Sequence, residues 1–187
     1  VMQRAAPFEV RHYRPFIVAE TIVDGDMDAA SNVGFRRIAG YIFGDNRSVV
    51  GAVSPGPQGS ANAGSEKIAM TAPVTMEPQE SSASQTMAAN RWRVHFVLPK
   101  SLTMNTVPRP NNAQVNLREV PAKRYAVLSF SGFAGSEKVQ SKSAELLAWI
   151  SAQGFTPVGA PQLARYDPPW QLPFFRRNEI LVELSGL

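Results

Sequence analysis

The stretch FEVRHYRPFIVAETIV, residues 8–23, decides the fold class together with the segment that follows it. Apolar and polar residues alternate over 8–13, which is typical of a strand with one covered face. Phe16 begins a denser apolar run, as in a strand that is covered on both faces. Two successive strands are therefore predicted, with a bend near Pro15 between them.

Residues 24–46, DGDMDAASNVGFRRIAGYIFGDN, carry a helical signal directly after these strands. A helix over 28–43 is predicted because its apolar residues recur at three- and four-residue spacings along one face: Phe35, Ile38, Ala39 and Ile42. Asp26 or Asp28 is suited to cap the helix N-terminus, and Gly44 its C-terminus.

The same order of elements returns later in the chain. Residues 92–98, WRVHFVL, predict a strand with Trp92, Val94, Phe96 and Leu98 on one face. Further segments predict two strands within 115–131, a helix over 137–152 capped by Ser136, and strands over 162–166 and 178–184. The repeated order strand, strand, helix, strand, strand indicates a duplication with halves at roughly 8–100 and 115–187. We expect one α+β domain over 1–187, with two long helices on a mostly antiparallel sheet.

The composition excludes several kinds of chemistry. With 44% hydrophobic and 18% charged residues, the 187-residue chain is globular. It has no cysteine, so disulfides, thiolate metal sites and cysteine nucleophiles are excluded, and its two histidines, His12 and His95, argue against a multi-histidine metal site. The net charge of +4 is scattered, so no nucleic-acid binding is expected. No apolar run approaches the ~20 residues of a membrane span.

Candidate functional residues are few, because motifs for nucleophilic catalysis or nucleotide binding do not occur. A non-enzymatic protein is therefore expected. His95 is expected to be a surface or half-buried polar residue. His12 has two interpretations: a packed, hydrogen-bonded histidine, or an axial ligand of a haem iron. Met70 and Met76 are expected to fill gaps in the core rather than to bind a metal.

The late segment RYDPPWQLPFFRRNE, residues 165–179, is stiffened by prolines and rich in aromatic residues. Its aromatic side chains and arginines either cover a flat apolar ligand and pair with its carboxylates, or close the end of the core. In the second interpretation Arg177 pairs with Glu179 or Asp167. Elsewhere, Glu9 and Glu20 are expected to be solvated or salt-bridged.

Five motifs together resemble the SOUL haem-binding family: FEVRHY (8–13), GFRRIAGYIFGDN (34–46), KIAMTAPVT (67–75), RYDPPW (165–170) and RRNEILVEL (176–184). They follow the family order over nearly the whole chain and resemble its SOUL branch, which carries the RHY histidine, more than its p22 branch. The resemblance implies a distorted antiparallel β-barrel or sheet flanked by two long helices, built from two similar halves and related to the GyrI type. It also implies haem b or a related tetrapyrrole as the ligand.

The resemblance places site residues in three parts of the chain. It implies His12 as the axial ligand of the haem iron. The porphyrin of the p22 branch lies against the first helix and the late loop, which here correspond to Asn32, Phe35, Ala39 and Gly40 and to residues 167–170. Asn32 and Gly40 stand where that branch has an arginine and a lysine, and Phe35 and Ala39 replace two methionines.

We therefore expect a tetrapyrrole carrier, buffer or sensor. Apolar side chains would cover the porphyrin face and arginines would meet its propionates: Phe35, Ala39, Trp170, Phe174 and Phe175, with Arg36, Arg37, Arg176 and Arg177. The first alternative is an enzyme, related to hydrolases, that acts on a tetrapyrrole or another hydrophobic small molecule; two carboxylates converging on the pocket, such as Glu179 and Glu183, would favour it. The second alternative is a protein-interaction module with incidental haem affinity. A periplasmic or secreted location is expected if a signal peptide preceded Val1, and a cytoplasmic one otherwise.

Overall fold

The computed structural model describes residues 3–5, 7–49, 64–70, 73–79, 89–167 and 172–186 of the chain. Its elements follow one another as β1 (Gln3–Ala5), β2 (Phe8–Tyr13), β3 (Phe16–Asp24), α1 (Met27–Ile42), β4 (Asn46–Arg47), β5 (Val74–Pro78), β6 (Arg91–Val97), β7 (Arg109–Pro110), β8 (Asn116–Val120), β9 (Lys123–Ser131), α2 (Ser136–Ala152), β10 (Pro157–Arg165), the 3-10 helix η2 (Pro173–Phe175) and β11 (Arg177–Leu184).

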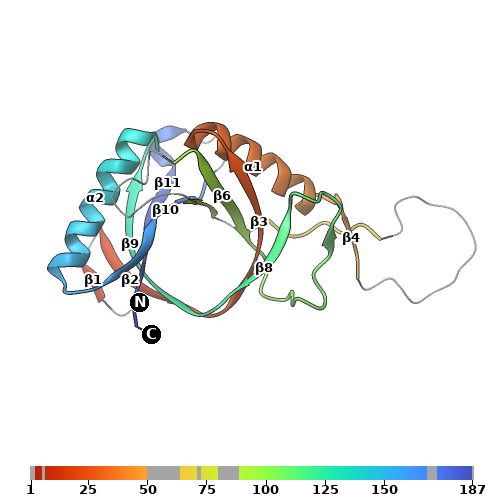
Figure 1. The fold of residues 1–187 in the computed structure, drawn as a ribbon, viewed down its shortest axis with the longest axis horizontal. Coiled ribbons are helices and arrows are strands. Elements are labelled where there is room, and N and C mark those ends of the chain that lie inside the picture. Colours follow the sequence, from red (N-terminus) through yellow and green to blue (C-terminus); the bar gives the residue numbers. More distant parts are fainter. Residues whose placement is uncertain are drawn as a thin grey trace, which may run out of the picture.

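Nine of the described strands form one antiparallel sheet in the order β1-β2-β9-β11-β10-β5-β6-β3-β8 (Figure 1). Apart from β1, the order is symmetric about the β10–β5 pair, because β11 matches β6, β9 matches β3 and β2 matches β8. The two halves also exchange strands: β2 pairs with β9, and β3 pairs with β8. Each half thus completes the sheet of the other.

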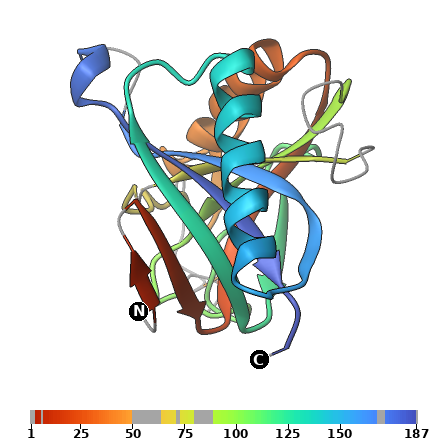
Figure 2. The ribbon, with the colours of Figure 1, turned by 90° about the vertical axis from the view of Figure 1, so that its left-hand side faces the viewer.

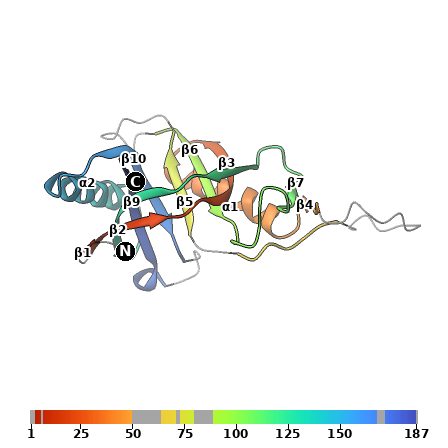
Figure 3. The same ribbon diagram turned by 90° about the horizontal axis from the view of Figure 1, so that it is seen from below.

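The expected antiparallel sheet flanked by two helices is confirmed, but the sheet does not close into a barrel. Its edges are β1 and β8, and no pairing joins them within the described part of the chain. The chain instead crosses beneath the sheet twice, from β2 to β3 and from β8 to β9 (Figures 1 and 3). The result is a strongly curved, open sheet.

Helix α1 forms as its sequence predicts, with a small shift of its ends. Asp26 is the N-cap, and its side chain accepts a hydrogen bond of 2.8 Å from the amide of Ala29. Phe43 is the C-cap and is followed by Gly44 at φ 121°, a conformation that favours glycine. A Cβ atom on Gly34 would lie 2.6 Å from the Cβ of Val94, so glycine lets the helix approach β6 closely.

Helix α2 differs from its prediction at the N-terminus. Gly135 is the N-cap without a side-chain hydrogen bond, and Ser136 is already the first helical residue. The capping role predicted for Ser136 is therefore wrong. The predicted apolar side is present, since Val139, Leu146 and Ile150 are buried.

The two faces of the sheet carry different side chains. Both helices lie on the outer face, where α2 covers β9, β10 and β11 and α1 covers β3 and β6 (Figures 1 and 2). The main hydrophobic core fills this interface. The inner face has a smaller buried cluster of Tyr125, Val127, Ala164 and Leu181, and is otherwise rich in polar side chains. Both the helix side and the inner side of the sheet therefore offer surfaces to a ligand.

Candidate functional site

Two cavities of ligand size lie on the two sides of the sheet. The first, here called the helix cavity, has a volume of about 480 Å³ and lies between α1, the β9–α2 loop and the segment around Arg165 and Arg176. The second, here called the inner cavity, has a volume of about 980 Å³ and lies on the inner face of the sheet. Both volumes fall within the range of small-molecule sites in proteins, ~300–1,000 Å³.

The helix cavity is held in shape by Arg165 at the end of β10. Its guanidinium donates hydrogen bonds to Ser31 Oγ at 2.9 Å and to Asp28 Oδ1 at 3.2 Å, both on α1. It also donates to the carbonyl of Ala134 at 3.1 Å. Arg165 thereby joins the helix to the loop before α2. This residue was not among the predicted site residues, although it opens the RYDPPW motif.

The lining of the helix cavity combines apolar surface with cations. Phe35, Val74 and Phe96 supply apolar walls, and Met70 places a thioether in the cavity while remaining 52% exposed. Met70 is therefore not the core residue that was expected, whereas Met76 is fully buried. Arg176 lies over the ring of Phe133, with 5.2 Å between the guanidinium carbon and the ring centroid.

The structure brings three of the predicted site residues together in the helix cavity: Asn32, Phe35 and Arg176. Arg36 is exposed and Ala39 and Gly40 are half-buried on α1, and the cavity lining does not include them. Phe174 is 64% exposed and its ring lies 4.5 Å from that of Phe175. Trp170 lies outside the described residues.

His12 belongs to the other cavity. It is exposed on β2 and lies at the lining of the inner cavity, together with Tyr13 and residues of the β2–β3 turn. The helix cavity does not include it. A single ligand therefore does not contact His12 and the α1 residues in this arrangement, and the role of His12 as an iron ligand stays a prediction.

Four polar side chains are buried around the inner cavity: Thr75, His95, Tyr125 and Gln162. The expectation that His95 is a surface or half-buried residue is wrong, since it is 8% exposed. Burial, with help from Arg118, Arg93 and Lys123, lowers the pKa of His95 to about 3, so its imidazole is neutral. Local alternation predicts that the face of β6 carrying His95 is polar and solvated, whereas in the curved sheet this inner face is buried.

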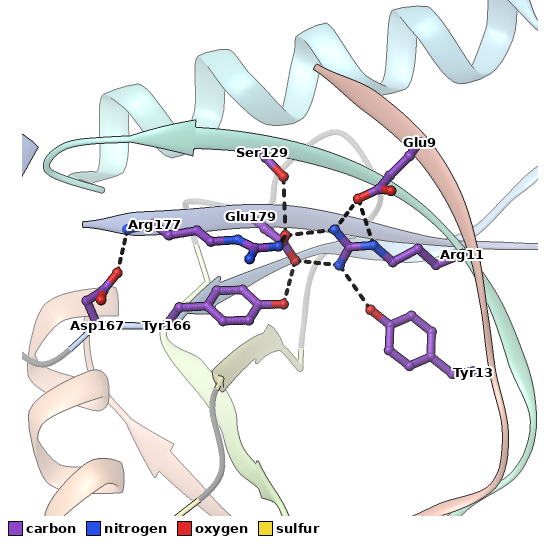
Figure 4. A network of polar contacts seen from close by, with 8 residues as sticks. All are labelled: Glu9, Arg11, Tyr13, Ser129, Tyr166, Asp167, Arg177 and Glu179. Atoms are coloured by element: carbon purple, nitrogen blue, oxygen red, sulfur yellow. Dashed lines mark hydrogen bonds and ion pairs between the residues drawn. The ribbon is translucent and has the colours of Figure 1, made fainter. Parts of the chain in front are cut away.

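Glu179 on β11 is the centre of a buried polar network on the inner face, on the side of the sheet away from α2 (Figure 4). Arg11 of β2 donates two hydrogen bonds of 2.8 Å to its carboxylate. Arg177 and Tyr166 each donate one of 2.6 Å, and Ser129 donates one of 3.2 Å. Burial alone would raise the pKa of Glu179, but these donors outweigh it and lower the pKa to about 2.

Both acidic side chains on this face of β11 are engaged by cations. Glu183, on the same face of β11, is paired with Lys123 at 2.5 Å. Neither Glu179 nor Glu183 belongs to the lining of either cavity. Arg177 contacts both acidic residues that were expected as its partners. Its side chain donates a hydrogen bond to Glu179, and its backbone amide donates one to Asp167 Oδ2 at 2.6 Å. Glu9 and Glu20 are salt-bridged as expected, to Arg11 and to Arg118.

Metal-binding clusters and membrane-spanning helices are both absent from the part of the chain that the structure describes. The described residues contain no cluster of three or more histidine, cysteine or acidic side chains arranged to hold a metal ion. None of their helices combines the length and apolar character needed to cross a membrane.

Comparison with known proteins gives a consistent family. Residues 1–183 match the family described as SOUL heme-binding protein. Heme-binding protein 2 of Mus musculus is 28% identical over 177 residues, which cover 92% of this chain and 76% of the mouse protein. Heme-binding protein 2 of Homo sapiens is 27% identical over 150 residues, which cover 79% of this chain and 63% of the human protein.

Solved structures extend the likeness in fold. The C-terminal domain of EcmrR superposes with a TM-score of 0.63 at 12% identity, covering 96% of this chain and 98% of that domain. An uncharacterized conserved protein from Listeria innocua gives a TM-score of 0.64 at 12% identity, covering 95% and 92% of the two chains. At this identity the likeness establishes the GyrI-like fold alone.

Proposed function

The chain belongs to the SOUL heme-binding protein family, and we propose that it binds haem or a related tetrapyrrole in the helix cavity and carries or buffers it without chemical change. One observation carries the choice of cavity. Asn32 and Phe35 of α1 and Arg176 of the late segment, which are far apart in the sequence, line the same cavity. Asn32 and Phe35 are positions at which the family resemblance implies porphyrin contact, and Arg176 is one of the arginines expected to meet the propionates.

The chemistry of this lining suits a porphyrin. Phe35, Val74 and Phe96 offer apolar surface to a flat macrocycle. Arg176 belongs to the lining and provides a guanidinium for a propionate. Met70 offers a thioether, a known axial donor to haem iron. When bound, the haem would supply its own iron chemistry, and the protein would supply shape, cations and this soft donor.

The absence of a free carboxylate pair on β11 favours carriage over hydrolysis. Glu179 is occupied by Arg11, Tyr166 and Arg177, and its low pKa keeps it ionised at neutral pH. A carboxylate in this state is a poor general base.

The test is a haemin titration followed by Soret absorbance. The variant Asn32→Trp fills the helix cavity and is expected to weaken haemin binding by about tenfold or more, because bulk replaces space that the macrocycle needs. Arg176→Ser removes a lining cation, and Arg36→Ser is its matched control, since Arg36 is exposed and outside the lining. We expect weaker binding only in Arg176→Ser. If the native protein shows no saturable binding of haemin, the proposal is overturned.

His12 defines the second candidate site. It is the exposed histidine at the inner cavity, whose volume of about 980 Å³ is also large enough for a tetrapyrrole. In that case His12→Ala would abolish the red-shifted Soret band and Asn32→Trp would leave it unchanged. In the helix cavity, Met70→Ala instead alters the band and His12→Ala does not.

Carriage without turnover has its own assay. The protein loaded with haemin is incubated with ascorbate in air, and the pigment is then extracted. We expect intact haem in full yield. If a ring-opened product forms faster from the loaded protein than from free haemin, the enzymatic alternative is favoured.

A further inference from the structure

The inner cavity contains a set of buried polar groups that haem binding in the helix cavity does not use. Thr75, His95, Tyr125 and Gln162 line it and are 6%, 8%, 6% and 8% exposed. Thr75 and His95 are direct partners in the β5–β6 pairing, and the other two lie on β9 and β10. Buried polar groups cost stability unless they are hydrogen-bonded. Tyr125 and Gln162 hydrogen-bond each other, whereas His95 leaves a buried nitrogen without a partner. A polar ligand group in the cavity would complete this set.

His95 makes this indication specific. Its Nδ1 atom is buried and has no hydrogen-bond partner in the described structure. A buried acceptor without a partner is tolerated better than a buried N–H donor without one. The favoured tautomer therefore leaves Nδ1 unprotonated and carries the proton on Nε2. The imidazole then offers an N–H donor to an acceptor bound in the cavity.

The charges around the cavity favour an anionic acceptor. Arg118, Arg93 and Lys123 lie near His95 but are ion-paired with Glu20, Glu77 and Glu183, so the charge open to a ligand is that of the lining itself. Among the described residues that line the cavity, Arg14 and Lys100 are cationic and Glu119 is the one acidic residue. The hydroxyls of Thr75 and Tyr125 are further donors of the kind a carboxylate accepts, and the side chain of Gln162 holds Tyr125 by a hydrogen bond.

A continuous part of the remaining lining is apolar. Phe16, Ile17, Leu98, Leu102 and Met104 come from the start of β3 and from the segment after β6. An apolar region beside a buried polar group matches a ligand that has one acidic head and a hydrocarbon body.

We propose that the inner cavity is a second ligand site, which binds an amphipathic carboxylate with its head among Thr75, His95, Tyr125 and Gln162 and its hydrocarbon body against the apolar lining. Its lining differs from that of the helix cavity except for Tyr166, which both cavities share. The site takes a monocarboxylate of the fatty-acid kind, whereas the propionates of a porphyrin belong to the helix cavity.

The test is calorimetric titration with three probes that share a hydrocarbon body: decanoate, decanol and decyltrimethylammonium. We expect one equivalent of decanoate to bind. Decanol should bind at least about tenfold more weakly than decanoate, and the cationic probe should not bind. Thr75→Val is isosteric and removes one donor, and His95→Phe removes another. Each is expected to weaken decanoate binding about tenfold and to leave decanol binding unchanged.

A crossed control separates this site from the haem site. Asn32→Trp is expected to lose haemin binding and keep decanoate binding, and Thr75→Val is expected to do the reverse. Thermal unfolding checks that each variant is folded; if His95→Phe is not, Thr75→Val carries the test. Equal binding of the three probes, no saturable decanoate binding, or displacement of decanoate by one equivalent of haemin would overturn the proposal.

Discussion

Replacing Glu179 with glutamine is expected to destabilise the protein strongly while preserving the shape of the side chain. The carboxylate is completely buried and accepts hydrogen bonds from Arg11, Arg177, Tyr166 and Ser129. Its pKa in the folded protein is about 2, against an ordinary value of 4.5. At about 1.4 kcal/mol for each tenfold change in proton affinity, the ionised group contributes about 3 kcal/mol at neutral pH. Removing one partner of a buried ion pair costs about 3–5 kcal/mol in other proteins, which agrees with this value.

The sign of the pH dependence follows from the lowered pKa. The contribution of Glu179 is fully present above the unfolded value of 4.5 and disappears as the pH falls through about 2. Urea unfolding at neutral pH should therefore separate Glu179→Gln from the native protein by about 3 kcal/mol, and at about pH 3 by only about 1–2 kcal/mol.

The matched control for this experiment is Glu183→Gln. Glu183 lies on the same face of the same strand, but its side chain is 24% exposed and its salt bridge is to Lys123. Its replacement should cost less than about 1 kcal/mol. The reasoning fails if both variants lose the same stability, or if the gap for Glu179→Gln does not shrink in acid.

Three further predictions concern the fold and the inner cavity. Gly34→Ala would place a Cβ 2.6 Å from the Cβ of Val94 and should cost about 1–3 kcal/mol in urea unfolding; Gly40→Ala, with nothing within 4 Å, should instead stabilise by up to about 1 kcal/mol, and equal effects would contradict the close approach of α1 to β6. Asp26→Ala removes the N-cap of α1 and should cost about 1 kcal/mol by the same measurement; no loss would show that water caps the helix equally well. His95, with its pKa lowered from 6.5 to about 3, should show no NMR titration between about pH 8 and pH 5. Because the unfolded chain takes up this proton first, stability should fall as the pH drops below 6.5, and His95→Phe should remove that slope.

Local patterns predicted much of the secondary structure. Strand β6 was predicted over 92–98 and is present over Arg91–Val97, because strict alternation of large apolar and polar residues leaves little freedom in its orientation. Helix α1 was predicted over 28–43 and is present over Met27–Ile42 for the corresponding reason, a helical spacing next to a capping aspartate. The apolar segment 67–74 was interpreted as part of a hairpin, whereas strand β5 is present over Val74–Pro78. Its five residues lie between segments of low complexity, and its place is set by pairing with β6 and β10.

Long-range geometry decided what the sequence could not indicate. His95 alternates like a surface residue, but it lies on the inner face of the curved sheet and is 8% exposed. Glu179 was expected to pair with its neighbour Arg177, and this pair is present, but the stronger partner is Arg11, which is distant in sequence. No local pattern links the two. The family resemblance, rather than periodicity, pointed to Asn32 and Phe35, and the structure adds the cavity that they share with Arg176.

The exchange of strands between the two halves also governs how the chain reaches its native state during synthesis. When only the first half has left the ribosome, β3, β5 and β6 can pair with one another, but β2 still lacks β9, β5 lacks β10, and β3 lacks β8. The nascent half therefore carries unpaired edges that neither helix covers. Pairings between such distant segments form slowly, so the sheet is expected to be completed late and all at once, after the last strand has emerged. A truncation that removes β11 would accordingly leave an aggregation-prone chain rather than a folded half.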